Sequence, residues 1–126
     1  MSDEVLPGAI ERYRQTLTEM ADLGGDQGFV SSTRRWDRLV DRLRQDETVV
    51  CASGEGREAV AALLADPRPT VRLWAATAAL TWEEEQARPV LVELRENPTL
   101  YGLNSISAKH ALLEFDPGRP DPPAPS

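Results

Sequence analysis

Apolar side chains recur at spacings of three and four residues along most of this chain, and this period limits the fold more than any other feature. The clearest example is a run in which Trp36, Leu39, Val40 and Leu43 stand at positions i, i+3, i+4 and i+7. An α-helix turns once in about 3.6 residues, so these four side chains share one helix face. The period therefore predicts a chain of amphipathic helices that pack their apolar faces together.

Residues that cap or break helices divide the chain into six predicted helices. Glycines at 24, 25 and 28 end the first helix, and prolines at 67 and 69 end the third, because neither residue type continues a helix well. Thr70 is expected to cap the fourth helix, and Asn104 or Ser105 the last. The six helices are expected to begin near residues 7, 31–33, 54, 71, 85 and 104.

Two segments are open to more than one interpretation. Residues 48–52 are β-branched in the manner of a strand, but no partner strand is evident, so we interpret them as a buried connector. The fifth helix would begin at Thr81 if it used the capping box there, but Pro89 would then lie deep inside it. We favour a start near Glu85, with a kinked helix as the alternative.

The length and composition fit one domain. A chain of 126 residues with 40% apolar and 28% charged side chains can build a core without disulfides or metals. We therefore expect a single all-α domain over residues 1–116. Residues 117–126 are rich in proline and poor in apolar side chains, which predicts a disordered tail.

The charge of the chain argues against nucleic acid and membrane surfaces as partners. The formal net charge is −7, whereas both kinds of partner attract clustered lysine and arginine. One local cluster of arginines is interrupted by aspartates at 37, 41 and 46, so we interpret it as an exposed helix face held by ion pairs. The arginines of this cluster are Arg34, Arg35, Arg38, Arg42 and Arg44.

No segment of the sequence is typical of export or of membrane insertion. The acidic stretch Met1–Glu4 lacks the basic and apolar regions of a signal peptide. The longest uncharged helical run, Leu73–Trp82, is too short to cross a bilayer. We therefore expect a cytoplasmic protein.

Residues able to carry out catalysis are few. Cys51 is the only cysteine and His110 the only histidine, and neither has a catalytic partner nearby in the sequence. A metal site would need several converging ligands. Gly54-Glu55-Gly56 lacks the Gly-Lys-Ser/Thr of a phosphate-binding loop. The sequence therefore predicts no catalytic residue, no metal site and no cofactor.

The middle of the chain repeats itself. A pattern of alanine and leucine four residues apart recurs after 28 residues, and a pattern of two alanines three residues apart recurs after 33. The matched pairs are Ala59–Leu63 with Ala87–Leu91, and Ala75–Ala78 with Ala108–Ala111. Two helix pairs with a shared internal pattern are typical of an α-solenoid. The expected architecture is therefore a short α-solenoid of about six helices in antiparallel pairs.

The segment Arg57–Ala76 resembles the HEAT-like repeats first noted in bilin lyases. It pairs a Glu-Ala-Val helix that ends in Asp-Pro with a following Val-Arg-x-x-Ala-Ala helix. The second copy keeps Ala87 and Pro89 but lacks the Val-Arg pair. The block 74–115 is also similar to a bacterial family of small HEAT-like proteins without an assigned function, through Trp-Ala-Ala, Ala-x-Pro-Val-Leu and Gly102. These resemblances imply a HEAT-like fold.

Members of such families often resemble immunity proteins encoded beside secreted toxins, which implies a non-catalytic protein-binding module of the immunity or antitoxin kind. An acidic surface suits a cationic toxin as its partner. The bilin-lyase resemblance implies an alternative, a lyase or cofactor-handling protein with a polar pocket around His110 or Glu83–Glu85. A third interpretation is a structural adaptor that forms a homodimer through an exposed helix face.

Candidates for partner contact lie near the ends of the repeat helices. Tryptophan and tyrosine are over-represented among the side chains that anchor interfaces. The alternative is that they fill space beside alanine-rich helices. The candidate residues are Arg72, Trp74, Trp82, Glu83, Glu84, Glu85, Tyr101 and Asn104.

Overall fold

The computed structural model describes residues 5–24 and 32–115, and within these ranges it contains helices and no strand. The elements are α1 (Val5–Asp22), α2 (Thr33–Val50), α3 (Gly54–Ala62), the 3₁₀ helix η2 (Leu63–Ala65), α4 (Pro69–Ala79), α5 (Glu84–Arg95), α6 (Pro98–Tyr101) and α7 (Leu103–Phe115). The all-α prediction is confirmed. The expected tail at 117–126 lies outside the described residues. None of the described helices combines the length and the apolar character needed to cross a bilayer.

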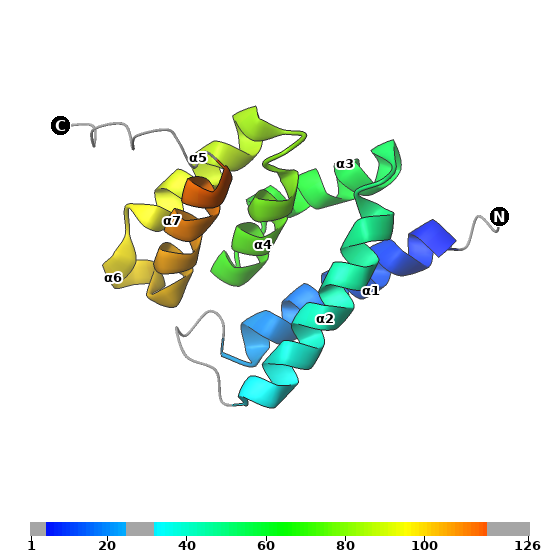
Figure 1. Ribbon diagram of the computed structural model, residues 1–126, viewed down its shortest axis with the longest axis horizontal. Helices are drawn as coiled ribbons and strands as arrows, with labels where there is room; N and C mark the ends of the chain where they lie inside the picture. Colours follow the sequence, from blue (N-terminus) through cyan, green and yellow to red (C-terminus); the bar gives the residue numbers. More distant parts are fainter. Residues whose placement is uncertain (1–4, 25–31, 116–126) are drawn as a thin grey trace.

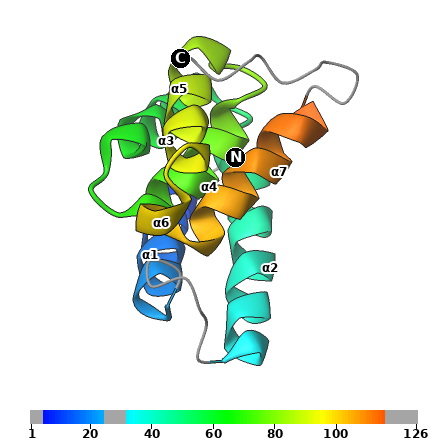
Figure 2. The same ribbon diagram turned by 90° about the vertical axis from the view of Figure 1, so that its left-hand side faces the viewer.

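The helix α4 lies at the centre of the molecule (Figure 1). It packs against α1 and α3 as well as against α5 and α7. Its buried apolar side chains point in several directions: Val71, Leu73, Ala75, Ala76 and Ala79 are each at most 5% exposed. A helix that is apolar on nearly all sides is stable only when neighbours surround it. Figure 2 shows the molecule from the side of α5 and α7, and these two helices lie in front of α4 in that view.

The helices α1 and α2 run antiparallel and share an apolar interface (Figure 1). Tyr13 and Leu17 from α1 and Leu43 from α2 are each at most 1% exposed. Ser32 caps α2, because its hydroxyl oxygen accepts a hydrogen bond from the backbone N–H of Arg35 at 3.3 Å. The predicted start of the second helix is therefore confirmed.

The C-terminal end of α2 corrects the prediction for residues 48–52. Residues 48–50 form the last turn of α2 instead of a connector. The helix satisfies the backbone there, since the N–H of Cys51 donates to the carbonyl oxygen of Glu47 at 2.8 Å. Val50 is fully buried, whereas its neighbour Val49 is 39% exposed. The β-branched composition was therefore outweighed by continuation of the helix.

Two predicted helix starts differ from the structure, and the favoured start near Glu85 is confirmed to within one residue. Arg68 stands at the N-cap of α4 and Pro69 occupies its first turn, so Thr70 is a buried helical residue and not the cap. The last helix begins at Leu103, which places Asn104 inside it. The fifth helix begins at Glu84, one residue before the favoured start, with Pro89 in its interior.

A short helix, α6, was not predicted. It fills the turn between α5 and α7, so the described ranges hold seven α-helices where six were expected. Pro98 fits its first turn, and Gly102 ends it with a φ of 56°, a conformation that favours glycine.

Candidate functional site

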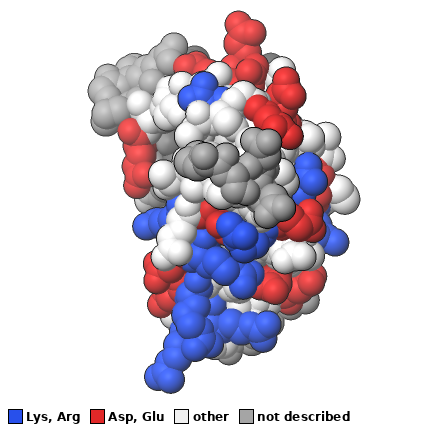
Figure 3. Space-filling model, turned by 90° about the vertical axis from the view of Figure 1, so that its right-hand side faces the viewer, with Lys and Arg blue, Asp and Glu red and all other residues white. Residues whose placement is uncertain are grey.

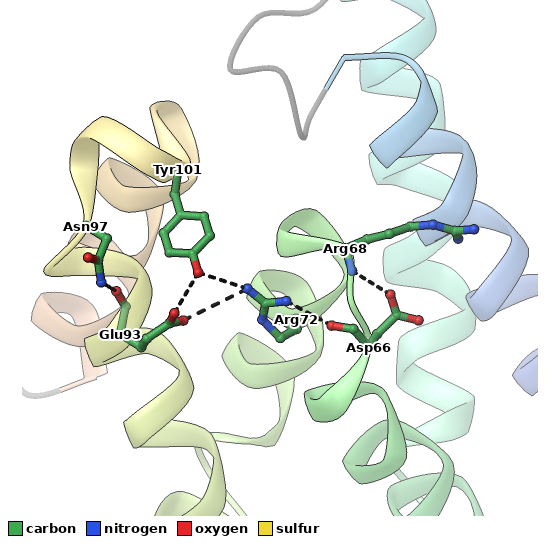
Figure 4. A network of polar contacts seen from close by, with 6 residues as sticks. All are labelled: Asp66, Arg68, Arg72, Glu93, Asn97 and Tyr101. Atoms are coloured by element: carbon green, nitrogen blue, oxygen red, sulfur yellow. Dashed lines mark hydrogen bonds and ion pairs between the residues drawn. The ribbon is translucent and has the colours of Figure 1, made fainter.

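Arg72, one turn into α4, joins several segments through polar contacts (Figure 4). Its Nη1 donates a hydrogen bond to the carbonyl oxygen of Asp66 (2.9 Å), and its Nη2 donates one to the Tyr101 hydroxyl (3.4 Å). The same Nη2 lies 3.9 Å from Glu93 Oε2, and the Tyr101 hydroxyl donates to Glu93 Oε1 at 2.6 Å. This last bond raises the pKa of Tyr101. The network ties the turn before α4 to α5 and α6.

The predicted tryptophans lie at the junction of α4 with α2 and α3. The ring of Trp74 packs edge-on against Trp36 of α2, with ring centroids 6.5 Å apart. The Arg57 guanidinium of α3 lies 5.4 Å from the centroid of the Trp82 ring. Both Trp74 and Trp82 are half-buried, so their main contacts are within the chain.

The remaining predicted residues lie at two other places. Glu83 stands at the N-cap of α5, and Glu84 and Glu85 are exposed in its first turn, where the helix dipole stabilises negative charge. Glu84 also forms an ion pair with Arg88 at 3.1 Å. Asn104 is buried in α7 and donates from Nδ2 to Thr70 Oγ1 at 3.4 Å. The eight predicted residues therefore lie at several places on the molecule; the structure brings Arg72 and Tyr101 into direct contact.

A polar pocket of about 420 Å³ lies where α2, α3 and α4 meet, and sequence analysis did not predict it. The Tyr13 hydroxyl donates to Glu47 Oε1 at 3.4 Å from behind the pocket wall. Burial raises the pKa of Glu47, and burial together with Glu47 raises the pKa of the Cys51 thiol. The indole N–H of Trp82 is buried beside the Cys51 thiol, where it acts on the thiol as a donor. The lining residues are Glu47, Thr48, Cys51, Arg57, Thr77, Ala78, Thr81 and Trp82.

The chemistry available to this pocket is limited by its own electrostatics. A thiol whose pKa is raised is mostly protonated at neutral pH and is a weak nucleophile. His110, the single histidine of the chain, is exposed on α7 and does not line the pocket. Among residues 5–24 and 32–115, no group of three or more His, Cys, Asp or Glu side chains is arranged to hold a metal ion. The pocket therefore offers hydrogen-bonding groups and no activated nucleophile.

Four large apolar side chains on α6 and α7 face the solvent. Leu100 is 71% exposed, Leu103 and Ile106 are each 52% exposed, and Leu113 is 39% exposed. We call these four residues the terminal stripe. Ile106 lies on the outer side of α7, whereas Ala108 and Leu112 are buried on its inner side. The apolar residues at 103, 106 and 113, spaced by three and then seven residues, were the signal for this outer face.

A second distinct surface is a row of four arginines on α2, which we call the arginine stripe: Arg34, Arg35, Arg38 and Arg42. All four are exposed. Arg42 is paired, with Glu19 Oε2 at 2.6 Å and with the hydroxyl of Thr16 at 2.9 Å. Among the described residues the side chains of the other three arginines make no ion pair or hydrogen bond. The predicted ion pairs between neighbouring turns of α2 are therefore absent. The ion pairs of α2 are instead formed with α1, through Arg42 with Glu19 and Asp46 with Arg12.

Comparison of the chain with protein-family models, with curated proteins and with solved structures found no match. The resemblance to HEAT-like repeats therefore stays a prediction from the sequence. The described residues thus offer three candidate binding surfaces: the terminal stripe, the arginine stripe and the polar pocket.

Proposed function

We propose that this chain is a non-catalytic protein-binding module that docks on its partner through the terminal stripe. The observation that carries the proposal is the exposure of four large apolar side chains at helical spacing on adjoining helices. Among the described residues, the other large apolar side chains exposed to this degree are Val5 and Val49, which lie on other helices. Contiguous apolar surface on a single chain is typical of a protein interaction site.

The position of the stripe supports the same proposal. We propose that α3 with α4 and α5 with α7 are two antiparallel pairs of a short HEAT-like solenoid. The repeated alanines have matching environments, since Ala75 and Ala108 are fully buried while Ala78 and Ala111 are half-buried. In a solenoid the outer face of a terminal helix is polar unless something covers it. The outer face of α7 is apolar at Leu103 and Ile106, so a covering partner would complete the stack.

The partner class that we propose is a toxin, with this chain as its immunity protein in the cytoplasm. The net charge of −7 would attract a cationic toxin at long range and speed its capture. Binding of this kind needs no catalytic group in the module itself. Blocking an active site requires only a rigid apolar anchor of the size of the terminal stripe and a polar rim around it.

A matched pair of variants tests the proposal. Ile106→Asp places a charge in the terminal stripe, and Ser107→Asp places the same charge on the adjoining exposed position of the same helix. Each tagged protein is used to capture partners from cells of the source organism, and bound proteins are identified by mass spectrometry. We expect one partner to be held by the unmodified chain and by Ser107→Asp but lost with Ile106→Asp, at equal melting temperatures.

Two further measurements separate the alternatives. The captured partner, expressed alone, should arrest growth, and co-expression with this chain should restore it; a harmless partner would contradict the immunity role. Equilibrium sedimentation of the purified chain tests whether a second copy covers the stripe. A dimer that Ile106→Asp dissociates would favour the structural adaptor over the toxin-binding module.

A further inference from the structure

We infer that the arginine stripe on α2 is a second binding surface, which takes a short acidic segment of a partner protein. This goes beyond the proposed function, because the surface and its chemistry differ from those of the terminal stripe. Figure 3 shows basic side chains gathered over the lower part of one face, the region in which Figure 1 places the N-terminal half of α2. The arginine stripe consists of Arg34, Arg35, Arg38 and Arg42 on α2.

Several of these arginines stand at positions where positive charge opposes the stability of the helix, although Asp37 and Asp41 offset part of that effect. Arg34, Arg38 and Arg42 follow one another at intervals of four residues, and like charges at that spacing repel. Arg34 and Arg35 also lie in the first turn of α2, where the helix dipole disfavours positive charge. No carboxylate of the described residues pairs with these two or with Arg38. A bound anion would relieve both kinds of repulsion.

The stripe borders a hollow that fits an extended peptide. A depression of about 350 Å³ between α1 and α2 is lined by Arg35, Arg38, Leu39, Arg42 and Glu19. From Arg34 to Arg42 the helix advances about 12 Å, at about 1.5 Å per residue. An extended peptide covers that distance in about four residues, since each adds about 3.3 Å. Arginine guanidinium groups bind carboxylates in bidentate fashion, so two to four acidic side chains would match the stripe.

The surroundings favour a short protein segment over a nucleic acid. Glu19, Asp37 and Asp41 lie on α1 and α2 close to the stripe, and the whole chain carries a charge of −7. A long polyanion would run past the arginines onto this negative surface, whereas a segment of a few residues ends before it. Net charge governs approach at long range, and local charges govern contact within a Debye length of about 8 Å. The stripe is therefore compatible with a partner that is cationic as a whole.

The test uses a labelled hexaglutamate peptide as the probe and two double variants of equal charge. Arg35→Gln/Arg38→Gln neutralises the middle of the stripe, and Arg14→Gln/Arg44→Gln removes two exposed arginines outside it. Binding is followed by fluorescence anisotropy at about 50 and 150 mM salt, with labelled oligothymidine as a second probe. We expect the stripe variant to weaken hexaglutamate binding by about tenfold or more and the control to weaken it by less than about twofold.

Each other outcome would overturn the inference. Equal weakening by both double variants would show attraction by overall charge, and tighter binding of oligothymidine would indicate a nucleic-acid surface. Absence of hexaglutamate binding by the unmodified chain would also reject it. The melting temperature of Arg35→Gln/Arg38→Gln should equal or exceed that of the unmodified chain, since repulsion is relieved; a clear fall would assign these arginines a structural role. Ile106→Asp should bind hexaglutamate normally, which separates this test from that of the proposed function.

Discussion

The helices α4 and α7 are both rich in alanine and leucine, but they stand in different surroundings. Helices α1, α3, α5 and α7 and the 3₁₀ helix η2 pack around α4, and most of its apolar side chains are buried. α7 is covered on one side by α5, α4 and α6, and its outer side exposes Leu103 and Ile106. Composition alone would have given both helices the same role. Neighbours decide whether apolar surface stabilises the fold or remains available to a partner.

Truncation of one leucine on each helix is the strongest test of this difference. Leu73 on α4 is 5% exposed and Leu103 on α7 is 52% exposed. Leu73→Ala should lower the free energy of unfolding by about 2–5 kcal/mol, because it removes buried methyl groups and leaves a cavity. Leu103→Ala should change it by less than about 0.5 kcal/mol, as for other surface positions. Urea denaturation of both variants measures the two values, and similar losses would mean that α7 is covered within the chain.

The buried contact between the end of α2 and the start of α3 leaves no room for a larger side chain. A Cβ atom at Gly56 would lie 1.8 Å from the carbonyl oxygen of Val50, which belongs to the backbone at the end of α2. Gly56→Ala should therefore destabilise the protein by about 1–3 kcal/mol, as overpacking does. Gly54→Ala is the matched control, since a Cβ there meets nothing within 4 Å. The control should leave stability unchanged or raise it by up to about 1 kcal/mol, because alanine favours the helix. Equal melting temperatures for the two variants would contradict the tight contact between α2 and α3.

The period of apolar residues predicted the helices well and their inward faces less well. It located α1, α2 and α4 because each shows one dominant buried face or, for α4, apolar side chains on nearly all sides. It did not determine the inward face of α7, because apolar residues stand on both sides of that helix. In α3 and η2 the repeat pattern pointed to Leu63, but Val60 and Leu64 are the buried residues. A shift of one residue turns a helix by about 100°, and only its neighbours fix that rotation.

The candidate surfaces depend on contacts that sequence spacing does not contain. Arg72 and Tyr101 are 29 residues apart and were both predicted as partner-binding residues, yet they bond to each other. The polar pocket joins Glu47 and Cys51 to Trp82 across three helices. The arginine cluster was visible in the sequence, but the expected ion pairs failed to form because the paired carboxylate, Glu19, lies on α1. The spacing of residues in the sequence therefore identified candidate residues, whereas the packing of the helices determined which side chains they contact.

The smallest expected change in stability concerns Glu47, a half-buried carboxyl on α2 at the edge of the core. Burial raises its pKa above the ordinary value of 4.5. The folded protein therefore holds the proton more tightly than the unfolded chain. The resulting stabilisation is complete below about pH 4.5 and is lost as the pH rises through the higher folded-state pKa. Above that folded-state pKa the ionised carboxylate is disfavoured by its half-buried position.

Glu47→Gln removes this titration while keeping an oxygen that accepts the hydrogen bond of the Tyr13 hydroxyl. The variant should match the unmodified protein near pH 4 and exceed its melting temperature at pH 7. The gain should stay below about 1 kcal/mol, since solvent screens a carboxylate that is only half-buried. Glu58→Gln, on the exposed side of α3, is the control and should follow the unmodified protein at both pH values. A variant that is less stable at pH 7 would show that the Glu47 charge supports the covered region, which would reverse the role assigned to burial there.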